Sequence, residues 1–352
     1  MTPLRLGFVG AGTMGQVAHL RNYVTLDDCQ VLALAELRPN LAENVARRYG
    51  IPKVYANHRE MIQQERSHLD ALVCIQPFTQ HGSLLPGILA AGLPILTEKP
   101  LANSLATGEQ LLARQRETGG KWFVAYHKRS DPAVMWARRK IDEWKTGGAM
   151  GTMRYVRITM PPGDWIAGGF TTLLRSDESQ PAGRSDPAPR GISEERFKML
   201  TEFVNYYIHQ VNLLRHLLGE PYRVAWADPA GVLLVGRSAS GVTGVLEMGS
   251  HRTTLAWQET ALVCFEKGWI RIDLPAPLAV DRPGRVVVYS DPGGGAEPQR
   301  VEPQLPWIHA MRRQAMNFLQ AVRGESTPLA GAAEALEDLR IAQEWLDMYK
   351  RA

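Results

Sequence analysis

Short apolar runs alternate with amphipathic stretches over the first 145 residues of the chain. Five of the runs have the length and composition of buried strands: Leu6–Val9, Val31–Ala35, Ala71–Ile75, Ile95–Thr97 and Trp122–Ala125. The stretches between them space their apolar residues as helices do: Met14–Tyr23, Leu41–Tyr49, Arg59–Gln64, Leu84–Ala91 and Leu105–Thr118. Strands that alternate with helices predict a parallel sheet that is covered on both faces.

The pattern changes after Gly151, because strand-like runs now follow one another directly. They are Thr152–Thr159, Val232–Val235, Val242–Met248, Ala261–Phe265, Trp269–Asp273 and Val286–Tyr289, and they predict an antiparallel sheet. Helices are expected at 197–218, 307–322 and 332–351. Residues 161–193 are rich in Gly, Pro, Ser, Asp and Arg and lack periodicity, which indicates a functional or mobile loop.

Composition narrows the classes of protein to consider. The chain has 352 residues, of which 45% are apolar and 22% charged, and its net charge is only +4. These values are typical of a globular protein and give no sign of a nucleic-acid or anionic-membrane partner. The three cysteines are far apart and form no metal motif, so we expect no disulfide framework, no metal site and a cytoplasmic location.

A glycine motif, Gly10-Ala11-Gly12-Thr13-Met14-Gly15, joins the first strand to the first helix. Gly10 permits a tight turn, Gly12 lets the backbone approach a pyrophosphate, and Gly15 lets the helix pack closely on the strand. The free N–H groups and the dipole of the helix start favour phosphate charge. This motif predicts a Rossmann doubly wound sheet as a dinucleotide-binding domain in residues 1–125. Residues 126–352 then form a second domain, in which the consecutive strand-like runs predict the antiparallel sheet.

Glu36 ends the second predicted strand, 21 residues after Gly15. Its carboxylate can accept hydrogen bonds from the adenosine ribose hydroxyls. A 2′-phosphate ~4 Å away would be repelled by about 4 kcal/mol at an effective dielectric constant of about 20. NAD is therefore favoured over NADP. Arg38 weakens this inference if it turns toward a phosphate, and the alternative for Arg38 is a solvated charge.

The strand at Ile95–Thr97 ends in Glu98-Lys99-Pro100. Charges at the carboxyl end of a parallel strand point into the crevice where open α/β sheets bind ligands. Proline disfavours helical geometry in the residue before it, so we expect Lys99 to be extended at that rim.

Together, these features resemble one family of oxidoreductases. The glycine motif, Pro77 and His81 in a P-x-x-x-H turn, and Glu-Lys-Pro resemble the glucose–fructose oxidoreductase/inositol dehydrogenase/rhizopine catabolism (Gfo/Idh/MocA) family. The resemblance continues through Tyr126-His127-Lys128-Arg129, the antiparallel sheet and the closing helices. It implies that residues 126–352 form a substrate-binding and oligomerisation domain, with an open antiparallel sheet covered by helices on one face and last helices that pack back toward the first domain.

The resemblance implies transfer of a hydride between a nicotinamide and a hydroxyl-bearing carbon of a sugar, cyclitol or sugar derivative. It implies that Lys99 binds the reacting oxygen, where a cation stabilises the developing alkoxide, and that Glu98 contacts the nicotinamide side of the cofactor. The residues expected to bind the cofactor are Gly10, Gly12, Thr13, Met14, Gly15, Glu36, Arg38, Gln76, Pro77, His81 and Glu98.

The second motif of the family, Asp-x-x-x-His on a helix, matches Asn205-Tyr206-Tyr207-Ile208-His209. His209 keeps the acid/base position of the family, and residues four apart share one helix face. Asn205 replaces the aspartate: it can orient the histidine but brings no charge, so we expect a less basic imidazole. The other polar residues of this face, Glu202, Asn212 and His216, are interpreted as a solvated surface.

The departure at Asn205 leaves several alternatives open. His209 serves alone, Lys99 carries the proton, or the chain is a non-catalytic dinucleotide-binding regulator or scaffold. A further alternative is a cofactor that stays bound and is recycled between two substrates.

His127, Arg129 and Trp165 are candidate substrate contacts, and Trp165 is suited to stacking on a sugar ring. Arg175, Arg184 and Arg190 are interpreted as loop charges. We expect a carbohydrate-like substrate and a homodimer or homotetramer assembled through the uncovered face of the antiparallel sheet.

Overall fold

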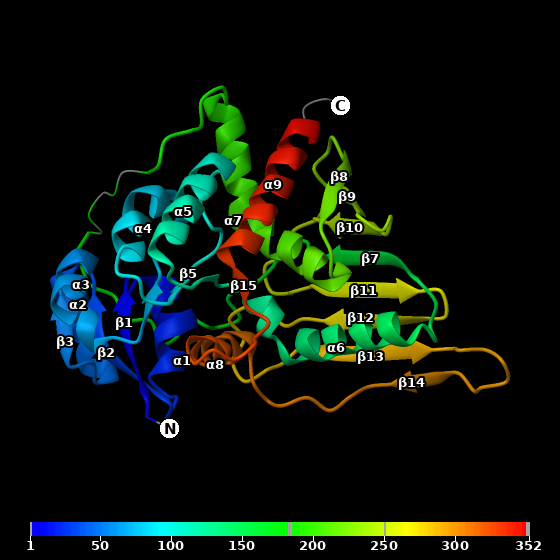
Figure 1. Ribbon diagram of the computed structural model, residues 1–352, viewed down its shortest axis with the longest axis horizontal. Coiled ribbons are helices and arrows are strands. Elements are labelled where there is room, and N and C mark those ends of the chain that lie inside the picture. Colours follow the sequence, from blue (N-terminus) through cyan, green and yellow to red (C-terminus); the bar gives the residue numbers. More distant parts are fainter. Residues whose placement is uncertain (1, 180, 182, 184, 250, 350–352) are drawn as a thin grey trace. The chain divides into compact units, whose positions relative to one another are not determined.

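The computed structural model describes residues 2–179, 181, 183, 185–249 and 251–349, and it divides into two compact units (Figure 1). The first unit contains residues 1–126, 169–205 and 314–339. The second contains residues 127–168, 206–313 and 340–352. Three segments of the chain, distant in sequence, therefore build each unit.

A seven-stranded sheet forms the centre of the first unit, in the order β15-β6-β5-β4-β1-β2-β3. Its strands are β1 (Leu4–Val9), β2 (Cys29–Ala35), β3 (Lys53–Tyr55), β4 (Ala71–Cys74), β5 (Ile95–Thr97), β6 (Trp122–Val124) and β15 (Ala330–Gly331). All neighbours are parallel except β15, which is antiparallel to β6. The six parallel strands have the order of a Rossmann sheet, so this prediction is confirmed. The sequence reading missed β3 and β15, which are short and, as Lys53–Tyr55 and Ala330–Gly331, contain no run of apolar residues like those of β5 and β6.

The helices of this unit agree with the expected spans to within a few residues. They are η1 (a π-helix, Gly15–Leu20), α1 (Arg21–Tyr23), α2 (Pro39–Tyr49), α3 (His58–Glu65), η2 (Arg66–His68), η3 (Phe78–Gln80), α4 (His81–Leu89) and α5 (Leu105–Thr118). Ser104 caps α5 by accepting a hydrogen bond from Thr107 N, and Gly119 ends that helix with a φ of +70°.

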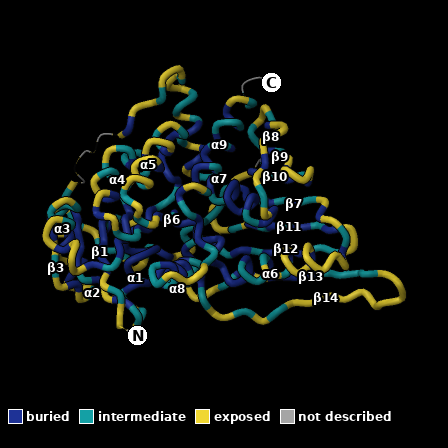
Figure 2. Tube along the Cα trace, in the orientation of Figure 1, coloured by how far each residue is buried: buried dark blue, intermediate teal, exposed yellow. Residues whose placement is uncertain are grey.

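The core of the first unit combines the sheet with a distant helix, α8 (Ala310–Val322). Phe8 packs edge to face on Tyr23, and Tyr23 packs on Phe318 of α8. All three side chains are fully buried. Figure 2 shows that buried residues, in dark blue, predominate along the central strands of this sheet. Aromatic burial thus fixes α8 to strands that come some 300 residues earlier in the chain.

The second unit contains an eight-stranded sheet, in the order β14-β13-β12-β11-β7-β10-β9-β8. Its strands are β7 (Met153–Thr159), β8 (Tyr222–Ala227), β9 (Leu233–Ser238), β10 (Thr243–Glu247), β11 (Thr260–Phe265), β12 (Gly268–Asp273), β13 (Arg285–Ser290) and β14 (Gln299–Val301). The expected antiparallel sheet is confirmed except at one place, since β10 pairs with β7 in parallel. A helix lies between these two strands in sequence, so the chain can return to begin β10 in the direction of β7.

Helices cover one face of this sheet. The helix α6 (Pro132–Gly147) contacts β12 and β13, and Leu214 of α7 (Glu194–Leu218) packs against Gly244 of β10. The sequence reading missed α6, although Asp131 caps it, Pro132 begins it and Gly148 ends it. The last helix, α9, spans Ala332–Tyr349, and the expected end at residue 351 lies outside the described residues.

Among the helices of the described residues, none is long and apolar enough to cross a membrane. All three cysteines have free thiols, as expected from their spacing.

Candidate active site

Three glycines shape the turn after β1. Gly10 has a φ of +91°, and a Cβ on this residue would lie 2.4 Å from the carbonyl oxygen of Ile75. A Cβ on Gly15 would lie 2.3 Å from the carbonyl oxygen of Gly10. In contrast, a Cβ on Gly12 would meet nothing nearer than Arg38 Nη2, at 3.9 Å. The turn is therefore closely packed at Gly10 and Gly15 and open at Gly12, the arrangement that a pyrophosphate requires.

Glu36 lies beside this turn. Its Oε2 accepts a hydrogen bond from Ala11 N at 2.7 Å, and its Oε1 accepts one from Arg38 Nε at 2.8 Å. The side chain is only 5% exposed. A carboxylate fixed at the end of β2, next to open backbone at Gly12, fits the ribose and the diphosphate of a dinucleotide.

The other residues expected at the cofactor differ in exposure. Thr13 is exposed and Met14 is half-buried, and Gln76 and Pro77 follow shortly after β4. His81 is completely buried, and its Nδ1–H donates to the carbonyl oxygen of Leu101 at 3.0 Å. Burial lowers the pKa of His81, so its ring is neutral at neutral pH. Its contact with Leu101 supports the segment that follows Lys99.

Glu98 and Lys99 directly follow β5. Glu98 Oε1 lies 2.6 Å from His19 Nε2, and Glu98 Oε2 accepts a hydrogen bond from Lys99 N at 3.0 Å. Burial acts to raise the pKa of Glu98, but the hydrogen bond and charge of His19, together with the charge of Lys99, hold that pKa below its ordinary value. Glu98 is therefore ionised at neutral pH. The sequence reading missed His19, because its only signal is its place on the helix after the glycine turn.

Lys99 Nζ donates a hydrogen bond of 2.6 Å to the main-chain oxygen of Asn205 within the first unit. The side chain at position 205 is therefore not needed for this contact. The peptide bond between Lys99 and Pro100 is cis.

Within the second unit, two predicted site residues come together. The rings of His127 and His209 lie edge to face, with centroids 4.5 Å apart. His127 belongs to the short helix η4 (His127–Ser130), and His209 belongs to α7.

A buried polar group links the neighbours of these two histidines. Lys128 Nζ donates to Glu259 Oε2 at 2.5 Å, and Gln210 Nε2 donates to Glu259 Oε1 at 2.7 Å. Lys128 is 4% exposed and Glu259 is 2% exposed. The sequence reading did not find this group, because no spacing connects residues 128, 210 and 259.

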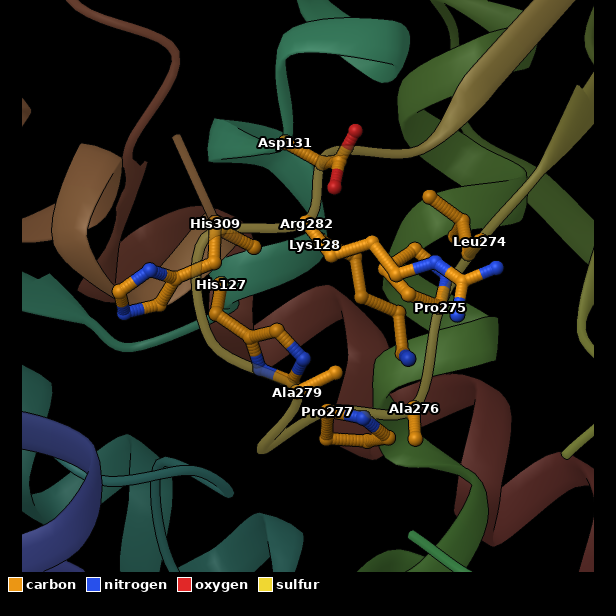
Figure 3. A pocket seen from close by; sticks show the side chains of 11 residues that line it. His127, Lys128, Asp131, Leu274, Pro275, Ala276, Pro277, Ala279, Arg282 and His309 are labelled. Carbon is orange, nitrogen blue, oxygen red and sulfur yellow. The ribbon is translucent and has the colours of Figure 1, made fainter. Parts of the chain in front are cut away.

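His127 and Lys128 also line a pocket of the second unit, shown in Figure 3. The start of α6, the segment 274–279 and His309 form its other walls. Asp131 Oδ1 accepts hydrogen bonds from Ala133 N and Gly284 N, but burial outweighs them and raises the pKa of Asp131 to about 6. Asp131 therefore takes up a proton at a higher pH than an ordinary aspartate does.

The remaining expectations for the second unit have mixed outcomes. Arg129 is buried, and Trp165 is half-buried with its main-chain oxygen bonded to Leu278 N at 3.3 Å. Glu202 is exposed as expected, but the interpretation of Asn212 as a solvated residue is wrong, since it is 1% exposed. Residues 208–218 of α7 are nearly all buried, so Asn212 is not on a solvated face.

The expected loop charges and metal content can be stated for part of the chain only. Arg184 lies outside the described residues, and Arg175 is exposed. Within the described ranges, no three His, Cys, Asp or Glu side chains are grouped so that they could hold a metal ion.

Comparison with known proteins agrees with this geometry. Residues 4–126 match the model of an oxidoreductase family with the NAD-binding Rossmann fold. The chain is 23% identical to myo-inositol 2-dehydrogenase of Thermotoga maritima over 284 residues, covering 77% of this chain and 75% of that protein. It is 25% identical to the rhizopine catabolism protein MocA of Rhizobium meliloti over 371 residues, covering 100% of this chain and 96% of that protein.

A solved structure supports the fold. Levoglucosan dehydrogenase, in complex with NADH and levoglucosan, superposes with a TM-score of 0.72 at 18% identity, covering 99% of this chain and 98% of that one. Residues 4–126 therefore carry the NAD-binding Rossmann fold of the matching oxidoreductase family model, and the whole chain is similar to an inositol dehydrogenase and a rhizopine catabolism protein.

Proposed function

We propose that this oxidoreductase acts on a secondary hydroxyl or the corresponding keto carbon of a sugar, cyclitol or sugar derivative. The observation that carries the proposal is Lys99, an ammonium group directly after the carboxyl end of β5 that is bound by the main-chain oxygen of Asn205. The names of the relatives, an inositol dehydrogenase and a rhizopine catabolism protein, support this substrate class.

Each group has a defined task in the proposed reaction. NAD, when bound, supplies the carbon that accepts or donates the hydride. Lys99 binds the reacting oxygen and stabilises the negative charge that develops on it. His209 takes the hydroxyl proton during oxidation and returns it during reduction. His127, Arg129 and Trp165 are proposed to contact the substrate.

Asn205 supports a second candidate function. The neutral amide at this position brings no negative charge four residues before His209 on the helix, so it does not favour the imidazolium form as an aspartate would. A protein that binds NAD and a partner without turnover would tolerate this change.

Turnover of NAD⁺ with a panel of inositols, aldoses and sugar acids tests the enzyme proposal. Lys99→Ala should reduce kcat/KM by about 10²-fold or more, because it removes transition-state stabilisation. Lys121→Ala is the matched control. Lys121 also donates a hydrogen bond to a main-chain oxygen, that of Ala321, but it lies at the amino end of β6, away from the carboxyl ends of the strands. This variant should therefore keep its activity. Activity that survives Lys99→Ala, or NADH binding without turnover on the whole panel, would favour the regulator.

We further propose a cytoplasmic homodimer or homotetramer. Along β11, Ala261 and Val263 are buried, whereas Leu262 and Cys264 on the other face are only half-buried. A sheet face that carries such apolar side chains suits a second copy of the chain. Light scattering at micromolar concentration should report at least twice the mass of one chain, and the mass of a single chain would contradict the proposal.

A further inference from the structure

The segment that follows residue 168 lies against the dinucleotide-binding side of the first unit. The side-chain amide of Gln16, in the helix after the glycine turn, donates to Leu174 O at 3.1 Å and accepts from Leu174 N at 3.0 Å. Arg48 of α2 donates to Thr172 O at 3.0 Å. Residues 172–174 are thus attached to two helices that begin at the carboxyl edge of the parallel sheet.

The same segment supplies the cap of α2. Glu178 Oε1 accepts a hydrogen bond from Asn40 N at 3.1 Å, and Glu178 Oε2 accepts one from Leu41 N at 3.0 Å. Arg38, the residue at the N-cap position of α2, makes no side-chain capping bond. A carboxylate from far along the chain therefore occupies two of the N–H groups that a helix start leaves unsatisfied.

This carboxylate is charged at neutral pH. Burial acts to raise the pKa of Glu178, but the hydrogen bonds from Asn40 N and Leu41 N, with smaller effects of Ser176 and Arg38, lower it below its ordinary value.

Among the described residues around the end of β2, carboxylates surround the cation that could bind a phosphate. Arg38 is the nearby guanidinium, and it is paired with Glu36 at 2.8 Å. Glu178 adds a second negative charge within electrostatic range of the same arginine. In Rossmann folds, the acidic residue after the second strand binds the ribose 2′-hydroxyl, and an arginine nearby accommodates the 2′-phosphate of NADP. In this chain, the carboxylates of Glu36 and Glu178 outnumber the single guanidinium of Arg38. The carboxylate of Glu178 also caps the start of α2.

We propose that Glu178 is a cofactor-specificity residue. Together with Glu36 it repels the charged 2′-phosphate of NADP, and it does not repel the neutral 2′-hydroxyl of NAD. The inference rests on the proposed function only in requiring that the chain binds a nicotinamide dinucleotide. It assigns a role to a segment that lies outside residues 4–126.

Binding without substrate tests the proposal. Titration of the full-length protein with NADH and, separately, NADPH, followed by cofactor fluorescence, gives two Kd values. Glu178→Gln removes the charge and keeps an oxygen for the N–H groups of α2. The Kd for NADPH should fall by about tenfold, because the variant loses one charge that repels the 2′-phosphate, while the Kd for NADH changes less than twofold.

Asp177→Asn is the matched control. It removes the same charge from the neighbouring, exposed residue, which makes no bond to α2 among the described contacts. Both of its Kd values should stay within twofold of those of the unmodified protein. Glu178→Ser also removes the charge. If Glu178→Gln does not fold, the two Kd values are measured for Glu178→Ser, and the same changes are expected.

The proposal would be overturned if Glu178→Gln left the ratio of the NADPH and NADH Kd values unchanged. It would also be overturned if Asp177→Asn changed that ratio as much as Glu178→Gln does. These outcomes do not depend on turnover. Failure of every polyol as a substrate would refute the proposed function and leave the specificity result intact.

Discussion

His127 and His209 pack ring against ring, with their planes at 76° to each other. Neither ring is fully exposed, and their sequence neighbours Lys128 and Gln210 bind the same carboxylate, that of Glu259. A ring packed against another ring has few available rotamers. We infer that this packing orients the ring of His209. The neutral Asn205 supplies no charge for that purpose.

This packing leads to the first prediction, on substitutions of His127. His127→Phe keeps a ring against His209, whereas His127→Ala removes it. An edge-to-face pair is worth about 0.5–1.5 kcal/mol, so kcat of the alanine variant should lie about two- to tenfold below that of the phenylalanine variant. Steady-state kinetics at saturating substrate measures the ratio. Because both variants lack the imidazole, equal kcat values would mean that the ring contact does not position His209.

The second prediction concerns Asn205→Asp, which restores a carboxylate four residues before His209. A negative charge at this spacing stabilises the protonated imidazole. The acid limb of the pH–rate profile should therefore move to higher pH, while the contact of Lys99 persists because it uses the main-chain oxygen. Thr201→Asp adds the same charge one turn earlier in α7. A profile that moves equally in both variants would show a general field effect rather than a specific partner.

Much of the first unit was predictable from the sequence, because its signals are local. The alternation of apolar runs predicted five of the parallel strands, and the spacing of the glycines after β1 predicted the turn between the first strand and the first helix. The position of Lys99 after β5 follows from the same local pattern.

The contacts that complete the site were not predictable, because they join residues that no period relates. Glu178 reaches the start of α2 across 138 residues, and Glu259 binds Lys128 across 131. Asp131 and Pro132 did signal the start of α6, but the apolar positions of that helix are interrupted by charges. The sequence reading therefore missed this helix, although both of its ends carry capping residues.

The third prediction concerns the buried pair of Lys128 and Glu259. Glu259→Gln removes the charge that compensates a lysine of which only 4% is exposed. Loss of one partner of a buried pair costs about 3–5 kcal/mol, because the remaining charge stays desolvated. The free energy of unfolding, measured with urea, should fall by that amount.

Glu117→Gln is the control for this prediction. It breaks the exposed pair of Arg114 and Glu117, which should change the free energy of unfolding by less than about 1 kcal/mol. Equal effects of the two variants would show that burial does not determine the contribution of the Lys128–Glu259 pair.

The last prediction is a pH dependence of stability that arises from Asp131. Burial raises its pKa to about 6 in the folded chain, above the ordinary value of 3.8. Between these values the unfolded chain ionises first, so the contribution of this carboxyl to stability falls as pH rises from 4 to 6. Asp131→Asn keeps an oxygen for Ala133 N and has no charge. We therefore expect the difference between the two free energies of unfolding, that of the unmodified protein minus that of Asp131→Asn, to decrease by up to about 3 kcal/mol from pH 4 to pH 7. The exposed Asp142, on the same helix, supplies the control Asp142→Asn, and a difference that increases with pH for Asp131→Asn would refute the argument.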